Sequence, residues 1–461
     1  MKSFRYVAAC ALAAACIVAA PARAAESTED RLKALESQVS ALKKELTAAN
    51  STGTLPAERL AELERQIDLL SREIEKLRIG DAAEEKPLTS KHGLGPAASK
   101  VYRKEKGVSI GGYGEVLYQN FGTESDDGLP SGLKDTADLQ RVVLYFGYKW
   151  NDSWLFNSEI EWEHATTGEG AEEKGEVSVE FANLEYLIRN EANIRAGLVL
   201  IPVGFINELH EPPVYLGARR PDVERAIIPA TWREIGVGAF GDAGPVTYRG
   251  YVVAGLSAAG FSASGIRDGR QQGSNSVADD LALTGRVDWN AAAGLVLGAS
   301  FFTGKAGQGL QDLNAANIGA QTTILEGHAE WRWRGIEARG LYAQTSIDDV
   351  ARLNDALGFT GADSIGESQV GWYAQAGYDV LTHVKDTQQS LVPFVRYEAY
   401  DTQREVPAGF LRDGANDISV KTVGVSWRPI TYVVVKADYQ DIDNRAGTGT
   451  DQWNLALGFI F

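Results

Sequence analysis

Cysteine, methionine and proline are scarce in this sequence. Its 461 residues include two cysteines, one methionine and 14 prolines, beside 49 glycines. Both cysteines, Cys10 and Cys16, lie near the amino terminus. The rest of the chain therefore has no thiol for a disulfide framework or for a thiolate metal site.

Positive charge is also scarce. The chain has 45 Lys and Arg against 62 Asp and Glu, which gives a formal net charge of -17. A protein that coats nucleic acid needs a basic surface to neutralise phosphates, so we expect no nucleic-acid partner. The mean hydropathy of -0.20 and the 23% of charged residues exclude both a disordered polyelectrolyte and a bundle of hydrophobic membrane helices.

The first 24 residues have the order of a secretory signal peptide. Lys2 and Arg5 precede an apolar stretch over 6–20, and Ala22 and Ala24 form a small-residue cleavage motif. We predict that residues 1–24 are a signal peptide cleaved after Ala24. A lipoprotein signal, acylated at Cys16, is the alternative interpretation.

The next segment has apolar residues at alternating spacings of three and four. They are Leu32, Leu35, Val39, Leu42, Leu46, Leu60, Leu63, Ile67, Leu70, Ile74 and Leu77. This is the a and d pattern of a coiled coil, so we predict a self-associating coiled coil over residues 25–79. A single amphipathic helix packed on a globular domain is the alternative. Residues 80–106, with Pro87, Gly93, Gly95 and Pro96, are expected to form a flexible linker.

From residue 107 to the end, the hydrophobic period changes to two. Sixteen alternating segments follow one another, and their connections are alternately short and long. This arrangement is typical of an up-and-down antiparallel barrel with turns at one rim and long loops at the other. We therefore predict an all-β fold over residues 107–461: a 16-stranded transmembrane β-barrel preceded by the coiled-coil helix.

The faces of the strands indicate what surrounds the barrel. In the segment 324–334, Glu326, His328 and Glu330 alternate with apolar Leu325 and Trp331. A soluble sheet would cover its apolar face with another layer, and the chain has no helix or second sheet available for this. The apolar face is therefore expected to contact lipid, and the charged face to line a water-filled lumen.

The last strand ends in an aromatic residue, Phe461, and the first predicted strand carries Gly112, Tyr113 and Gly114. The long connection over 202–230 contains the segment 210–213, and the segments 201–205 and 228–234 overlap its two ends. In these features the sequence resembles bacterial outer-membrane porins of the phosphate-selective porin O/P superfamily. The resemblance implies a Gram-negative outer-membrane protein that forms homotrimers, with its coiled coil in the periplasm. It also implies that Phe461 is a signal for the outer-membrane assembly machinery.

The third long connection, 202–230, is the kind of loop that porins fold into the pore. The constriction candidates in this loop and at the start of the next strand are His210, Glu211, Arg219, Arg220, Arg225, Arg233 and Glu234. The four arginines can form an electropositive ring that selects anions, or they can pair with neighbouring acids and only hold the loop in place. Both interpretations remain open.

The lumen-lining candidates on the strands carry charges of both signs. They are Arg141, Glu159, Glu161, Arg195, Glu326, Glu330, Arg332, Arg396 and Arg428. Acids outnumber bases on the predicted lumen face as a whole, which departs from the Lys and Arg ladder of phosphate-selective porins.

No motif in the sequence indicates an enzyme. The five histidines are scattered, and only His328 has acidic neighbours on its own face, so we expect no metal site, no cofactor and no catalytic residues. Two function classes remain. One is a passive diffusion channel for small hydrophilic solutes or ions, such as phosphate. The other is a structural or adhesive outer-membrane anchor with a plugged barrel.

Overall fold

A computed structural model describes residues 28–52, 59, 62–63, 65–71, 89–167, 175–385 and 387–461. The chain divides into two units, Met1–Pro87 and Leu88–Phe461. The predicted signal peptide, residues 1–24, lies outside the described residues. Among the residues that are described, no helix is both long and apolar enough to cross a membrane.

The first unit contains the helix α1, Thr28–Thr52. Leu35 and Val39, which occupy predicted seam positions, are buried, and so is Leu63 in the helical residues that follow. This burial fits the predicted apolar seam. Self-association through residues 25–79 stays a prediction.

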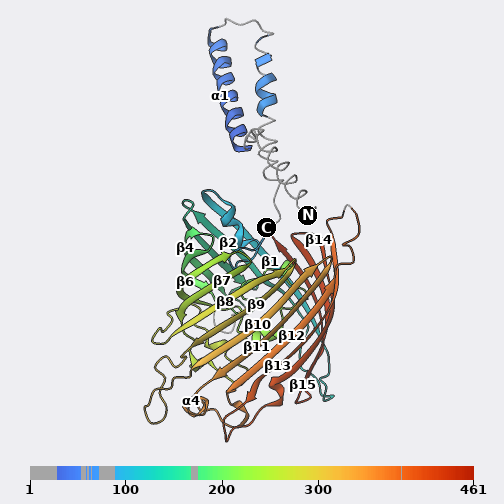
Figure 1. The fold of residues 1–461 in the computed structure, drawn as a ribbon. Helices are drawn as coiled ribbons and strands as arrows, with labels where there is room; N and C mark the ends of the chain where they lie inside the picture. Colours follow the sequence, from blue (N-terminus) through green and yellow to red (C-terminus); the bar gives the residue numbers. More distant parts are fainter. Residues whose placement is uncertain are drawn as a thin grey trace, which may run out of the picture. The chain divides into compact units, whose positions relative to one another are not determined.

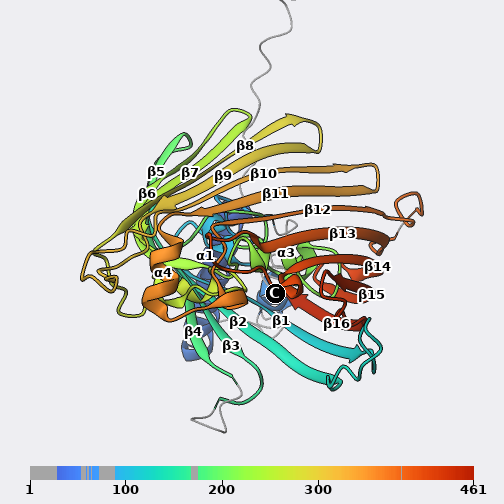
Figure 2. The same ribbon diagram turned by 90° about the horizontal axis from the view of Figure 1, so that it is seen from below.

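The second unit is a closed antiparallel barrel in which each strand pairs with its sequence neighbours and β1 pairs with β16 (Figures 1 and 2). The strands are β1 Gly107–Phe121, β2 Thr136–Lys149, β3 Trp154–Glu163, β4 Val177–Arg189, β5 Ala192–Leu200, β6 Arg233–Ala243, β7 Val246–Ala254, β8 Leu281–Ala292, β9 Leu295–Gly304, β10 Thr322–Trp333, β11 Ile336–Ile347, β12 Ser368–Tyr378, β13 Ser390–Glu405, β14 Asp417–Ile430, β15 Val433–Asn444 and β16 Gln452–Ile460. The prediction of a 16-stranded transmembrane β-barrel is confirmed.

Barrel closure depends on small residues in the first strand. Phe461 and Gly112 exchange backbone hydrogen bonds, with the Phe461 N–H donating to Gly112 over 2.9 Å. A Cβ on Gly112 would lie 2.6 Å from the Phe461 ring, and one on Gly114 would lie 2.5 Å from the Phe459 ring. Because Gly has no side chain, both aromatic rings can pack directly on β1.

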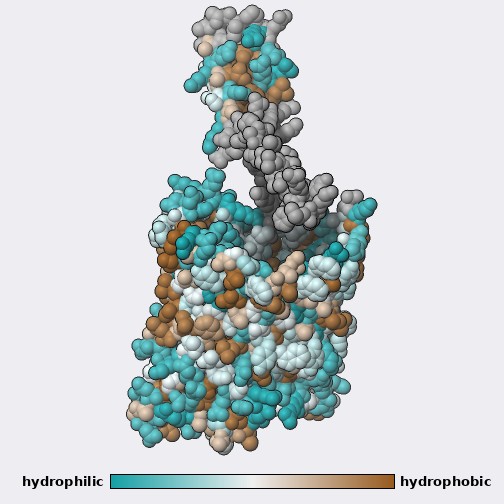
Figure 3. Space-filling view, viewed as in Figure 1, coloured by the Kyte–Doolittle hydropathy of each residue, from teal (hydrophilic) through white to brown (hydrophobic). Residues whose placement is uncertain are grey.

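The outer wall is apolar. Its exposed side chains include Leu325 at 61%, Trp331 at 39% and Trp333 at 43% exposure. Figure 3 shows apolar side chains, in brown, along the barrel wall and mostly polar ones, in teal, at the loop end. A wall with this pattern is suited to lipid, since barrel closure leaves no unpaired strand edge in the hydrocarbon layer.

The two rims differ in the length of their connections. Short turns, such as 190–191 and 334–335, lie at the rim from which β1 starts, and long loops lie at the other. The described loops and the segment before β1 contain short helices: η1 Ala98–Arg103, η3 Pro212–Val214, α3 Asp222–Ala226, η4 Ala258–Gly260, η5 Arg267–Gly269, α4 Val350–Leu357, η6 Gly361–Asp363 and η7 Gly414–Asn416. Figure 2 shows α3 inside the ring of strands.

Candidate functional site

The third long loop, residues 201–232 between β5 and β6, lies inside the barrel. Its apolar side chains pack against apolar side chains of the inner wall. The loop contributes Ile201, Val203, Phe205, Val223, Ile227, Ile228 and Trp232, and the wall contributes Tyr251, Phe302, Leu341 and Tyr373. Each fully buried side chain of this size contributes about 1.5–3 kcal/mol, so the cluster holds the loop in the lumen. The inner face is thus partly apolar, whereas the sequence predicted a charged one.

A second segment, residues 89–106, fills the lumen on the side of the short turns. We call it the N-terminal lumen segment. Leu94, Ala97, Ala98 and Val101 in this segment are buried. The Asn157 amide of β3 donates to the Ala98 carbonyl over 3.0 Å.

This finding differs from the flexible linker expected over 80–106. The sequence favours a linker there because of Gly93, Gly95 and Pro96. In the structure, Gly93 and Gly95 allow close approach, because a Cβ on them would lie 2.3 Å from a Glu208 oxygen and 2.4 Å from a Glu211 oxygen. The expected linker therefore includes a packed part of the barrel unit.

His92 fixes the start of this segment. Its ring packs against Tyr102 and Phe240 with centroids 4.9 Å and 5.0 Å apart, and its carbonyl accepts a hydrogen bond from Arg195 over 3.0 Å. Burial, together with the positive charges of Lys91, Arg195 and Arg249, lowers the pKa of His92 to about 3. At neutral pH the docked segment therefore holds a neutral imidazole, with its Nδ1 3.5 Å from an Asp242 oxygen.

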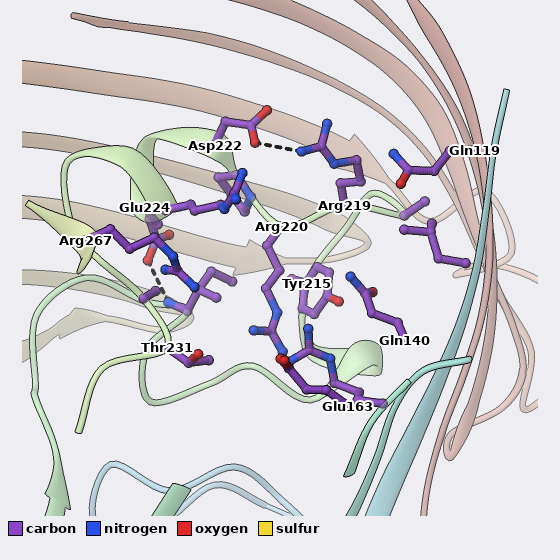
Figure 4. A pocket seen from close by; sticks show the side chains of 17 residues that line it. Gln119, Gln140, Glu163, Tyr215, Arg219, Arg220, Asp222, Glu224, Thr231 and Arg267 are labelled. Carbon is purple, nitrogen blue, oxygen red and sulfur yellow. Dashed lines mark hydrogen bonds and ion pairs between the residues drawn. The ribbon is translucent and has the colours of Figure 1, made fainter. Parts of the chain in front are cut away.

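Between the third long loop and the barrel wall lies a cavity of about 300 Å³, drawn in Figure 4. Its charged lining residues are Arg141, Glu163, Arg219, Arg220, Asp222, Glu224, Arg225 and Arg267. Arginines from the wall, the loop and η5 thus face one space, and they outnumber the acids there.

The arginines of this cavity fall into two groups. Arg141 pairs with Glu161 at 2.9 Å, and Arg219 pairs with Asp222 at 3.1 Å. In contrast, Arg220, Arg225 and Arg267 form no ion pair with any described residue; Arg220 Nε and Arg267 Nη1 are buried there without a hydrogen-bond partner.

The electrostatic field at Arg267 reflects this cluster. Burial and the nearby guanidiniums of Arg270, Arg225 and Arg220 lower the pKa of Arg267 to about 9. Arg267 stays cationic at neutral pH, and the nearby guanidiniums add to the effect of burial on its pKa, so positive charge is concentrated here. Such a cavity favours an anion.

The remaining predicted constriction residues are engaged elsewhere. Arg233 of β6 pairs with Glu180 of β4 at 2.5 Å, and Glu234 accepts from the backbone N–H of Gln271 over 2.9 Å. His210 lies 3.0 Å from Glu159, and Glu211 binds the N-terminal lumen segment through Ala97. Of the four predicted ring arginines, the structure brings Arg219, Arg220 and Arg225 to the cavity and pairs Arg233 outside it.

The predicted lumen-lining residues lie on the inner face, mostly in ion pairs. Besides Arg141–Glu161, the pairs are Arg195–Glu185 at 2.7 Å, Arg332–Glu330 at 2.6 Å, Arg339–Glu330 at 2.9 Å, Arg396–Glu398 at 2.7 Å, Arg428–Glu337 at 3.2 Å, His210–Glu159 at 3.0 Å and His328–Glu326 at 2.8 Å. A count of charges on the lumen face therefore says little about selectivity, because most of these charges compensate each other locally.

Sequence reasoning missed several inner charges. Arg286 and Asp288 of β8 pair at 2.8 Å, and Arg249 of β7 pairs with Glu208 at 2.7 Å. Strict alternation with outward Val287 and Trp289 could have located Arg286 and Asp288. Arg267 had no such signal, because it lies in a loop.

Comparisons with known proteins agree with this architecture. The structure resembles OmpF of Salmonella typhi, solved as a complex with daunomycin, with a TM-score of 0.52 and 14% identity over 78% of this chain and 99% of that one. It also resembles the outer-membrane channel DcaP of Acinetobacter baumannii, with a TM-score of 0.49 and 13% identity over 77% and 97% of the two chains. The molecule is a barrel of the outer-membrane porin fold.

One relative establishes the family. The chain is 40% identical over 377 residues to an uncharacterized protein of Aquifex aeolicus (strain VF5), a match that covers 80% of this chain and 83% of the relative. The chain belongs to the same family as this protein. No protein-family profile matches it.

Proposed function

We propose that the protein is a porin of the bacterial outer membrane, a passive channel for small hydrophilic anions. The observation that carries the proposal is the cavity inside the barrel where Arg220, Arg225 and Arg267 lack carboxylate partners among the described residues. Cationic groups held near a low-dielectric wall concentrate anions and lower the barrier to their entry. Solutes would move down their own gradient, without a cofactor or a covalent step.

Inorganic phosphate is the solute to test first. An oxyanion can accept hydrogen bonds from several guanidinium groups at once, and the free nitrogens of Arg220 and Arg267 supply such donors. The sequence resemblance to phosphate-selective porins supports the same choice. Membership of that superfamily is part of this proposal.

The cellular setting is proposed as well. The apolar outer wall supports a position in lipid. The homotrimer, the periplasmic coiled coil and the recognition of Phe461 by the assembly machinery are proposed from the sequence resemblance. The OmpF-like fold supports an outer-membrane location.

The experiment is a reversal-potential measurement in a salt gradient on Arg220→Gln/Arg225→Gln/Arg267→Gln. We expect the reversal potential to shift towards cation preference and block by phosphate to weaken. Arg352→Gln is the matched control, because Arg352 belongs to α4, pairs with Asp312 at 2.9 Å and does not line the cavity. A triple variant that behaves like wild type would overturn the anion assignment.

A second candidate function is an outer-membrane anchor with a closed barrel. The N-terminal lumen segment favours it, because this segment buries Leu94 and Val101 in the lumen near the short turns. An anchor would carry no steady current, whereas a channel conducts.

A further inference from the structure

Three ionisable side chains from separate parts of the chain meet inside the barrel. His210 comes from the third long loop, Glu159 from β3 and Glu180 from β4, and one ligand atom of each lies within 4.8 Å of the others. Their exposed fractions are 2%, 0% and 2%. No sequence pattern connects these positions, and the sequence analysis expected no metal site.

A β-bulge aims Glu180 at this cluster. Glu159 is paired with Phe181 and Ile160 with Val179, so Glu180 is the extra residue on β4. As a result, both Glu180 and Phe181 are buried on the inner side. Bulges re-aim side chains in this way beside functional sites.

The hydrogen bonds of His210 leave one ring nitrogen for a cation. Nδ1 lies 3.2 Å from the Asn207 carbonyl oxygen, which can only accept, so Nδ1 carries a proton. Nε2 lies 3.0 Å from Glu159 Oε1. A neutral imidazole with its proton on Nδ1 presents a lone pair at Nε2, and this lone pair would then face a carboxylate oxygen. A cation is required between the two atoms, either a proton or a metal ion.

The carboxylates also have unused oxygens. Glu159 Oε2 and Glu180 Oε2 are buried without a hydrogen-bond partner among the described residues. The other oxygen of Glu180 accepts a hydrogen bond from Arg233 over 2.5 Å. Arg233 thus orients Glu180 as an outer-shell group orients a metal ligand, and the Asn207 carbonyl does the same for His210.

The cationic side chains nearby do not satisfy these two oxygens, and Glu161, whose carboxyl group lies within hydrogen-bond reach of that of Glu180, adds another acid beside the cluster. Glu161 pairs with Arg141 at 2.9 Å, and the Glu211 carboxylate accepts hydrogen bonds from the backbone N–H groups of Ala97 and Ala98. Arg220, near the cluster, donates to the His210 carbonyl instead, over 3.2 Å.

We propose that Glu159, Glu180 and His210 bind one divalent transition-metal ion of the Zn²⁺ class. One imidazole nitrogen with carboxylate oxygens suits Zn²⁺ or Mn²⁺ better than Mg²⁺ or Ca²⁺, which prefer oxygen ligands alone. Ligand atoms at about 2.0–2.2 Å from an ion lie at most about 4.4 Å apart, and the three ligand atoms here lie within 4.8 Å of one another, which is close to that span. The ion cross-links the third long loop to the barrel wall and keeps the constriction in place. The proposal does not depend on what the channel transports.

His328 provides the contrast. Its Nδ1 lies 2.8 Å from Glu326 and its Nε2 lies 2.8 Å from Asp288, so the two carboxylates lie on opposite ring nitrogens. No single ion can contact all three groups. Arg286 also binds Asp288, at 2.8 Å. His328→Gln is therefore a matched control: it removes a buried lumen histidine between two acids and leaves the proposed site intact.

The experiment uses the full-length protein in detergent, stripped with a chelator and then supplied with Zn²⁺, Mn²⁺ or Mg²⁺. We expect one tightly bound Zn²⁺ per chain by elemental analysis and a higher unfolding temperature with Zn²⁺ than with Mg²⁺. Co²⁺ should give a visible absorption band of a nitrogen and oxygen site. His210→Gln and Glu159→Gln should lose the bound metal and the Zn²⁺-dependent stabilisation, and His328→Gln should keep both.

Two results would overturn the proposal. If the stripped wild type takes up neither Zn²⁺ nor Co²⁺ and its unfolding temperature is unchanged, a proton alone holds His210 against Glu159. If His210→Gln binds metal as wild type does, the ion lies elsewhere. Because the wild-type titration is decisive by itself, a variant that fails to fold does not weaken the test.

Discussion

The carboxylate of Glu211 accepts hydrogen bonds from the backbone N–H of Ala97, at 3.0 Å and 3.1 Å to its two oxygens. Glu211 belongs to the third long loop and Ala97 to the N-terminal lumen segment, so the two segments that fill the barrel are joined directly. The N-terminal lumen segment fills the lumen on the side of the short turns. We infer that the lumen at this rim widens when the segment is released.

Leu94→Ala should weaken the docking of the N-terminal lumen segment. Leu94 is 2% exposed, and losing a buried leucine side chain costs about 2–5 kcal/mol. We expect larger conductance steps and faster proteolysis within residues 89–106. Leu313→Ala is the control, because Leu313 is 82% exposed and its truncation removes no packing. Equal conductance and equal proteolysis in Leu94→Ala and wild type would show that this segment does not restrict the pore.

Acid should release the same segment through His92. The pKa of His92 is lowered to about 3 when docked, mainly by burial, whereas a released histidine has a pKa near its ordinary value of 6.5. Between these values the released state binds a proton that the docked state does not, so the contribution of His92 to docking is fully present above pH 6.5 and weakens as the pH falls. Two acids oppose it: Asp242 lies 3.5 Å from His92 Nδ1, and burial raises the pKa of Glu211 to about 7, so Glu211 contributes more to docking as the pH falls. Conductance measured from pH 7.5 to pH 4.5 should increase in wild type relative to His92→Gln, because Glu211 is present in both proteins and only wild type has the His92 imidazole. Parallel pH profiles of the two proteins would contradict this.

The barrel seam should depend on the small residues of β1. Gly112→Val places a side chain where the Phe461 ring lies, 2.6 Å from the position of a Cβ. We expect lower surface levels of this variant and of a chain that lacks Phe461. The loss of Phe461 should lower assembly in cells more than it lowers the stability of refolded barrel, since burying one aromatic side chain contributes only about 1.5–3 kcal/mol. Surface levels are measured by surface labelling. Normal levels of both variants would refute the roles of Gly112 in closing the barrel and of Phe461 in its assembly.

The coiled coil should control assembly rather than folding. Deletion of residues 26–79 should weaken the oligomer in detergent, because the apolar seam would be lost. The β content measured by circular dichroism should stay unchanged, since the barrel satisfies its own backbone hydrogen bonds. An oligomer of unchanged stability after deletion would count against a coiled-coil contact between chains.

The barrel could be predicted from the sequence because lipid and lumen impose a simple period. Outward residues such as Trp331 and inward ones such as Glu326 alternate for many residues, and the rims are marked by loop length. The placement of the third long loop in the lumen is consistent with its many apolar residues, but only the structure shows the wall residues that they meet.

The parts of the structure that could not be predicted from the sequence depend on contacts between separate segments of the chain. The bulge at Glu180 changes which face its side chain occupies, and no residue type marks it. Arg267 reaches the cavity from a loop without periodicity. Leu94, Ala97 and Ala98 lie among Gly and Pro residues that favour a linker, and the partners that bury them are spread along the chain, from Tyr113 to Glu211 and Ile460.

The central claim is that the barrel conducts small anions, and the most direct measurement is single-channel current in a planar lipid bilayer. Purified full-length protein should give discrete, steady current steps, a reversal potential on the anion side in a chloride gradient, and lower chloride current when phosphate is added. Folded protein that inserts into the bilayer and gives no current steps, either in wild type or in Leu94→Ala, would contradict the account and leave the closed outer-membrane anchor.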